Sequence, residues 1–226
     1  RLRRWHPGYG VALAHAPEYD GLKGYRDGTV SADHVRAHTA LIESILGLLR
    51  ATAGRPAQLG CFGLHEWAMV HRVDETRHDR PLRLGRAGTD EVVESHRVAC
   101  SHFDAFRFFT PTARPLNALS PGRDDRAAYE QPGCLHANMD LYKHAFRLTP
   151  MVCSDLVADA FELAWDIRVL DMRASPYDLV DLGLEPIRIE TPQGKQEYTA
   201  AQRAFAERAA PLRRRLADEC ARLLAV

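Results

Sequence analysis

The sequence predicts a single compact domain, mainly α-helical with a small β element. Apolar residues recur every three or four positions in several stretches, which is typical of amphipathic helices. Prolines and glycines separate these stretches, and one short run alternates like a strand. The 226 residues suit one sizeable domain, and 46% hydrophobic with 27% charged residues is ordinary for a globular protein.

The first part of the chain is expected to be irregular and then helical. Residues 1–30 are rich in Gly, Pro and Tyr and predict an irregular N-terminal segment. Ser31 or Asp33 is a suitable N-cap for a helix that runs to about Ala51, and Gly54 and Pro56 follow it. A shorter helix is expected over residues 62–70.

The middle of the chain combines loops with one ambiguous segment. Residues 72–90 are polar and predict a long loop, after which Thr89 or Asp90 opens a short helical turn. Residues 98–109 contain four phenylalanines and predict a strand, with a helix as the alternative. Repeated prolines make residues 110–133 another loop.

The last part of the chain predicts long helices. Two are expected at about 134–148 and 151–172, separated by Pro150 and followed by Pro176. Residues 185–190 alternate and predict a short strand. Residues 193–225 predict an amphipathic helix, or a helix pair if Pro211 begins a second one.

The bulk composition limits the classes of function. The net charge of +0 argues against strong, non-specific binding to a phosphate backbone. Five cysteines without a CxxC pair indicate reduced thiols and a cytoplasmic protein, not a disulfide framework. No apolar run approaches the roughly 18 residues of a membrane span, so no membrane partner is expected. Because the chain begins at Arg1, its N-terminus is expected to be incomplete, and the oligomeric state is left open.

Residues 61–172 form the block in which we expect the active site. Histidines, carboxylates and aromatics crowd there into short islands, and buried ionisable groups are costly unless they are paired. His136, Asp140 and His144 have i, i+4, i+8 spacing and share one helix face. That face can hold a metal, orient a general acid–base pair, or be an ordinary polar surface.

Two further islands contribute candidates. Glu66 lies beside Trp67, and an apolar setting would raise its pKa and suit an acid–base role. If residues 98–109 are a strand, His102 and Asp104 share one face and can activate water together. The neighbouring phenylalanines then form either core or the wall of a pocket.

Four acids on the predicted 151–172 helix form a stripe of like charge. Such a stripe repels itself unless water, a metal or arginines offset it, and Arg213, Arg214 and Arg215 are available partners. The acids of this stripe are Asp155, Asp159, Glu162 and Asp166.

Several long motifs carry a family resemblance. They are LRRWHPG, CFGLHEWAMV, HFDAFRFFTP, EQPGCLHANMDLYK, ELAWDIR, LDMRASPYDL and AQRAFAERAAPLR. Through them nearly the whole chain resembles a group of actinobacterial proteins labelled 3-methyladenine DNA glycosylase. The resemblance implies hydrolysis of the N-glycosidic bond of an alkylated purine in DNA, with the base flipped into an aromatic pocket and a carboxylate activating water.

Two hypotheses follow. The first is a DNA glycosylase-like hydrolase in DNA repair, which needs no cofactor. The second is an enzyme that uses Zn, Fe or Mn on a small-molecule substrate. For the first, the catalytic candidates are Asp104, Asp140, Glu66 and His136, and the substrate-binding candidates are Trp67, His102, Phe103, Phe106, Asn138 and Tyr142. For the second, the metal ligands are expected among His65, His102 and His136.

Overall fold

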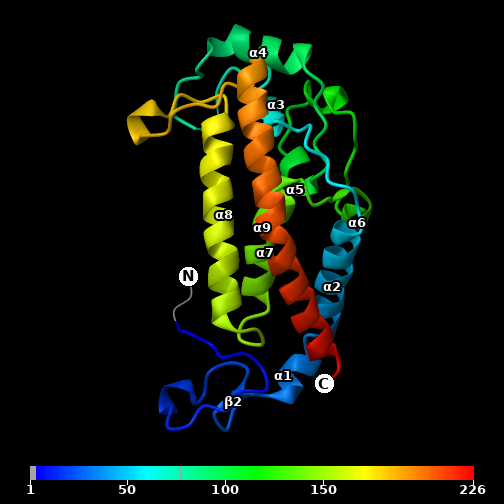
Figure 1. Cartoon of the computed structure of the whole chain (residues 1–226), viewed down its shortest axis with the longest axis vertical. Helices are drawn as coiled ribbons and strands as arrows, with labels where there is room; N and C mark the ends of the chain where they lie inside the picture. Colours follow the sequence, from blue (N-terminus) through cyan, green and yellow to red (C-terminus); the bar gives the residue numbers. More distant parts are fainter. Residues whose placement is uncertain (1–3, 77) are drawn as a thin grey trace.

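Long helices form the body of the molecule. The structure is a computed structural model that describes residues 4–76 and 78–226. Helices α7 (Leu135–Arg147), α8 (Ser154–Ala174) and α9 (Pro192–Leu224) pack against one another, and α2 (Thr39–Ala53) packs against α9 (Figure 1). The prediction of a mainly α-helical fold with a small β element is confirmed. Across the described ranges, no helix has both the length and the apolarity to cross a membrane.

Burial explains why these segments are helical. On α8 the buried side chains recur every three or four residues and face α7 and α9. They include Leu156, Ala160, Leu163, Ile167 and Leu170. The observed helices α7 and α8 therefore lie close to the ranges 134–148 and 151–172 that the apolar periodicity predicted.

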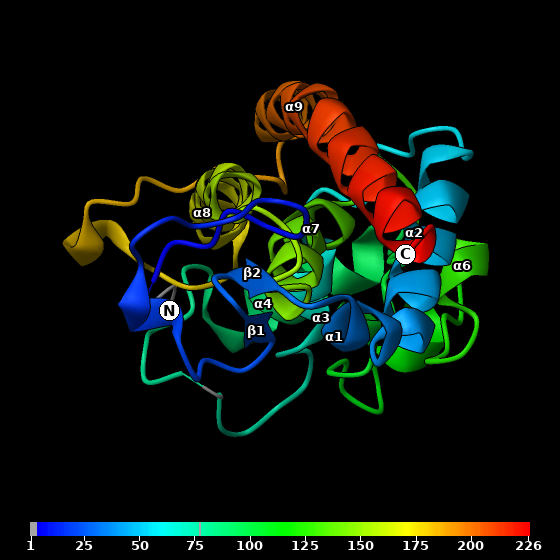
Figure 2. The same ribbon diagram turned by 90° about the horizontal axis from the view of Figure 1, so that it is seen from below.

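Helix α9 is one helix, not a pair. The Thr191 hydroxyl accepts a hydrogen bond from the Gly194 amide, and Pro192 occupies the first turn, where it needs no N–H partner. Pro211 lies inside the helix, which changes direction partway along (Figures 1 and 2). A proline removes one backbone hydrogen bond and kinks a helix without ending it when flanking turns are packed.

Short helices gather around the long ones. They are α1 (Ala32–Arg36), α3 (Leu64–Ala68), α4 (Gly85–Ser95), α5 (Phe103–Phe106) and α6 (Arg126–Tyr129), with 3-10 turns at Pro17–Tyr19, Arg114–Leu116 and Val180–Leu182. Ser31 caps α1 as expected, but the helix predicted to run to Ala51 breaks before α2. Helix α4 begins at Gly85, earlier than the turn predicted at Thr89.

The β element lies in an unexpected place. Strands β1 (Tyr25–Arg26) and β2 (Thr29–Val30) form a hairpin within the segment predicted to be irregular. Its turn residues Asp27 and Gly28 both have positive φ, which favours this tight antiparallel connection.

The two predicted strands are wrong. Residues 98–109 instead contain the short helix α5, so part of the helical alternative is right. Residues 185–190 contain no strand, although Ile187 and Ile189 are buried. The alternation of apolar and polar residues in this segment arises because Ile187 and Ile189 pack into the core and hold a connecting segment in place. A strand with one buried face gives the same alternation.

Candidate functional site

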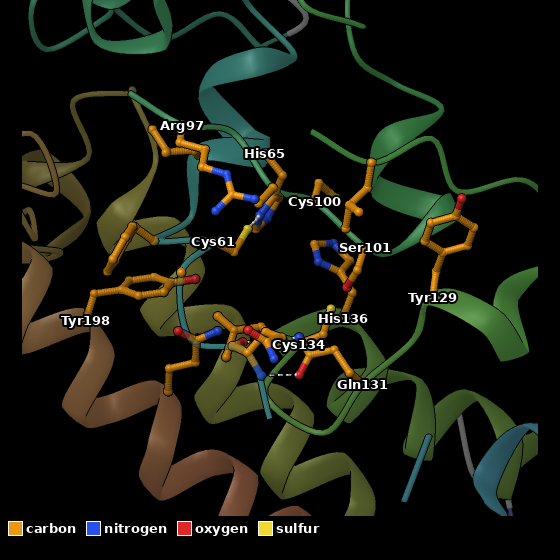
Figure 3. A pocket seen from close by; sticks show the side chains of 18 of the residues that line it. Cys61, His65, Arg97, Cys100, Ser101, Tyr129, Gln131, Cys134, His136 and Tyr198 are labelled. Atoms are coloured by element: carbon orange, nitrogen blue, oxygen red, sulfur yellow. Dashed lines mark hydrogen bonds between the residues drawn. The ribbon is translucent and has the colours of Figure 1, made fainter. Parts of the chain in front are cut away.

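A cavity that is partly open to solvent lies between the short helices and α9. It has a volume of about 720 Å³ and reaches the loop before α3, the residues after α4, helix α6 and the start of α7 (Figure 3). Its walls are partly apolar and partly polar, as is usual for a small-molecule site. Apolar contributors include Phe62, Leu119 and Leu135, and polar ones include Ser101, Gln131 and Tyr198.

Four ionisable side chains meet beside this cavity. His65 and Glu66 come from α3, His136 from α7 and Asp171 from α8. One potential ligand atom of each lies within 4.8 Å of the others. His65 and His136 also line the cavity, so the cluster and the cavity form one site.

The contact between His65 and Asp171 is close, but the two atoms are not aligned as in a regular hydrogen bond. The Nε2 atom of His65 lies 3.1 Å from Oδ1 of Asp171, and both side chains are almost completely buried. Neither atom has a hydrogen-bond partner among the described residues. Two buried polar atoms without partners need an explanation, because leaving them so is costly.

The charges within the cluster depend on one another. Burial alone lowers the pKa of His65, but the Asp171 carboxylate outweighs it and raises that pKa well above its usual value. Burial would raise the pKa of Asp171, yet the His65 imidazolium holds it below its usual range. Burial, together with Asp171, raises the pKa of Glu66 to about 7. Burial and the neighbouring His65 lower the pKa of His136 to about 3, so this ring is neutral at neutral pH.

A tight turn before α3 places Cys61 beside His65. Its Sγ lies 3.4 Å from Nδ1 of His65. Phe62 and Gly63 both have positive φ, and a Cβ on Gly63 would lie 3.2 Å from the Cβ of Ala174 and 3.3 Å from the Tyr198 ring. Glycine is therefore required at this position to bring the turn close to α8 and α9.

A second polar network lies beside the first. His102 is buried, and its Nε2 lies 3.3 Å from Oε1 of Glu130 and 3.4 Å from Oδ2 of Asp140. Arg126 donates hydrogen bonds to both carboxylates. The His102 ring centroid is 5.4 Å from that of His136, so the two networks are neighbours.

Two predicted catalytic carboxylates belong to this second network. Lys143 lies 2.9 Å from Asp104 and 3.1 Å from Asp140, and neither acid lines the cavity. His102 and Asp104 do not share a face as the strand prediction required. His102, the residue before helix α5, is buried in the interior, whereas Asp104 within that helix pairs with Lys143 and Arg107.

The predicted substrate-binding residues lie outside the cavity lining. Trp67 is 0% exposed, and its Nε1 donates to the Ala174 carbonyl. Asn138 is buried and accepts a hydrogen bond from Arg213. The partly buried side chains of Phe103, Phe106 and Tyr142 and the buried side chain of His102 are likewise absent from the lining.

Two of the four acids in the α8 stripe form ion pairs with arginines. Asp159 lies 2.6 Å from Arg215 and Asp166 lies 2.7 Å from Arg208, both arginines coming from α9. All four of these side chains are exposed to a similar degree. Arg215 is thus one of the partners expected from the sequence, whereas Arg213 is buried against Asn138.

The position of Asp171 in the sequence could have identified it as a site residue. Four residues after Ile167, it falls in phase with the apolar face of α8 and opposite the exposed acidic stripe. Burying an acid on the apolar face of a helix costs free energy, so such an acid is a candidate for a functional site.

Comparison of the chain with protein-family models, curated proteins and solved structures found no match.

Proposed function

We propose that the protein is a metal-dependent enzyme that acts on a small molecule in the cavity. His65, Glu66, His136 and Asp171 would hold one divalent ion. The observation that carries this proposal is the convergence of four potential ligand atoms within 4.8 Å of one another, two from buried and two from partly buried side chains, beside the cavity.

The His65–Asp171 contact supports a shared metal. Two ligand atoms that are each about 2.1 Å from one ion and subtend a right angle lie about 3.0 Å apart. The observed separation of 3.1 Å, without a hydrogen bond, agrees with that geometry. The neutral ring of His136 and its lack of a hydrogen-bond partner among the described residues leave it free to donate a lone pair.

The donor set favours a six-coordinate ion. Two imidazoles and two carboxylates suit iron(II), manganese(II) or zinc. Four protein ligands complete a tetrahedral zinc site, but they leave two positions on a six-coordinate ion. We therefore propose iron(II) or manganese(II), which would bind water or polarise a substrate oxygen on the cavity side.

Thiol catalysis is the second candidate function. Its supporting observation is the 3.4 Å contact between Cys61 and His65, since a nucleophilic cysteine needs a neighbouring base. A Cys–His–Asp arrangement also needs the acid to accept a hydrogen bond from the histidine. The His65–Asp171 contact lacks that hydrogen bond, so we place thiol catalysis second.

The glycosylase hypothesis stays a prediction from the resemblance. It requires an aromatic side chain that stacks on a flipped base. Trp67 is enclosed in the core, so the partly buried Phe62 and Tyr129 of the cavity wall would have to stack on the base. Release of 3-methyladenine from alkylated duplex DNA by the purified protein is the direct assay.

Elemental analysis with matched histidine variants tests the metal. After anaerobic reconstitution with iron(II), manganese(II) or zinc and removal of excess metal, wild type should retain about one ion per chain. His136→Gln and Asp171→Asn should retain little. His144→Gln changes a buried histidine of the same helix outside the cluster and should bind normally, as should Cys61→Ala. Equal metal in wild type and Asp171→Asn would refute the proposal, and loss of turnover in a metal-replete Cys61→Ala variant would favour thiol catalysis.

A further inference from the structure

The cavity wall carries positive charge and no acid. The cationic side chains that line it are Arg55, Arg97 and Lys195, and the lining contains no aspartate or glutamate. In a chain with as many acidic as basic residues, such one-sided charge in a cavity is a selective feature.

Arg97 lacks a carboxylate partner. Many arginines of the described chain are ion-paired, including Arg83, Arg126 and Arg215, but Arg97 forms no ion pair with any described acid. Figure 3 shows its guanidinium directed towards the side of the cavity that holds Cys61 and His65. A guanidinium that forms no ion pair and lies at the wall of a cavity is suited to bind a planar anion in a bidentate manner.

We propose that the cavity takes a small organic anion, a carboxylate or a phosphate ester, whose charged group is bound by Arg97. This inference rests on the proposed function, because it assigns the substrate class of the same site. A divalent ion held by Glu66 and Asp171 adds no net charge there, so Arg97 and Lys195 supply the selectivity. The apolar walls formed by Phe62, Leu119 and Leu135 would enclose the body of the ligand.

Titration with benzoate and benzamide tests the proposal, since the two differ mainly in charge. Wild type should bind benzoate at least about tenfold more tightly than benzamide, as one charge-assisted contact predicts. Arg97→Gln should remove this preference, and Arg97→Lys should keep part of it. Arg203→Gln, an equally exposed arginine of α9 outside the cavity lining, removes the same charge and should leave binding unchanged.

The metal and the anion site are separated by a second comparison. The titrations are repeated on Asp171→Asn, in which the proposed metal centre is broken. Benzoate selectivity that persists in Asp171→Asn and disappears in Arg97→Gln supports the proposal, whether or not wild type holds metal. Selectivity that persists in Arg97→Gln, or equal affinity of wild type for both probes, would overturn it. If the preference for benzoate is lost in Asp171→Asn but kept in Arg97→Gln, the metal binds the anion. That result would support the metal centre and overturn the role of Arg97.

Discussion

His65 and Asp171 are far apart in the chain, yet Nε2 of one lies 3.1 Å from Oδ1 of the other in a site closed to solvent. The contact joins α3 to α8 and forms one side of the four-residue cluster. It is also the reason to expect that metal binding stabilises the fold, because the ion would link three helices.

Metal addition should raise the melting temperature. At a free concentration of one hundred times the Kd, binding to the folded state alone adds about 2.7 kcal/mol to the free energy of unfolding. For a chain of this size, that corresponds to roughly 5–10 °C. Differential scanning fluorimetry with manganese(II) measures it. The shift should be absent in His136→Gln, and an equal shift in that variant would argue for binding elsewhere.

Arg126→Met should destabilise the protein strongly. The substitution leaves Glu130, whose side chain is 3% exposed, without its main cationic partner beside His102. Breaking one side of a buried ion pair costs about 3–5 kcal/mol. Arg208→Met breaks the exposed pair with Asp166 and should cost less than about 1 kcal/mol. Urea unfolding compares the two variants, and similar losses would contradict the assigned importance of the buried network.

The free energy of unfolding should decrease as the pH is lowered from 6.5, in part because of His144. Burial, with nearby cations, lowers the pKa of this histidine to about 4 in the folded state. The unfolded chain takes up the proton near pH 6.5, so the contribution is fully present above that pH and is lost as the pH falls towards 4. His144→Leu should therefore lose less stability over this window, by up to about 1.4 kcal/mol per pH unit. Unfolding curves at pH 6.5, 5.5 and 4.5 that stay parallel for both proteins would refute this.

Trp67→Phe should reduce stability and leave ligand binding intact. The smaller ring creates a cavity in the core, and the Ala174 carbonyl loses the hydrogen bond from Nε1. Together these changes cost about 2–4 kcal/mol. Benzoate affinity should not change, because Trp67 does not line the cavity. A variant of normal stability that no longer binds ligand would instead support the stacking role predicted from the sequence.

The sequence was a good guide to the long helices. The helical spacing of apolar residues repeats over many positions, as on α8 from Leu156 to Leu170. A single residue that departs from the spacing therefore does not change the prediction. It was a poor guide to short elements. The phenylalanines of residues 98–109 resemble a strand, but Phe103 and Phe106 sit on a four-residue helix fixed by its neighbours.

For the site, the sequence by itself identified three of the four cluster residues, whereas the tertiary structure added Asp171 and decided which side chains lie together. His65, Glu66 and His136 stand out because ionisable residues within apolar islands are costly without partners. Which partners they have depends on how α3, α7 and α8 pack. That packing brings Asp171 into contact with His65, draws Asp140 to Arg126 and Lys143, and encloses Trp67. The contacts of Asp171 with His65 and of Trp67 with Ala174 join positions far apart in the chain, and local periodicity carries no information about distances of that kind.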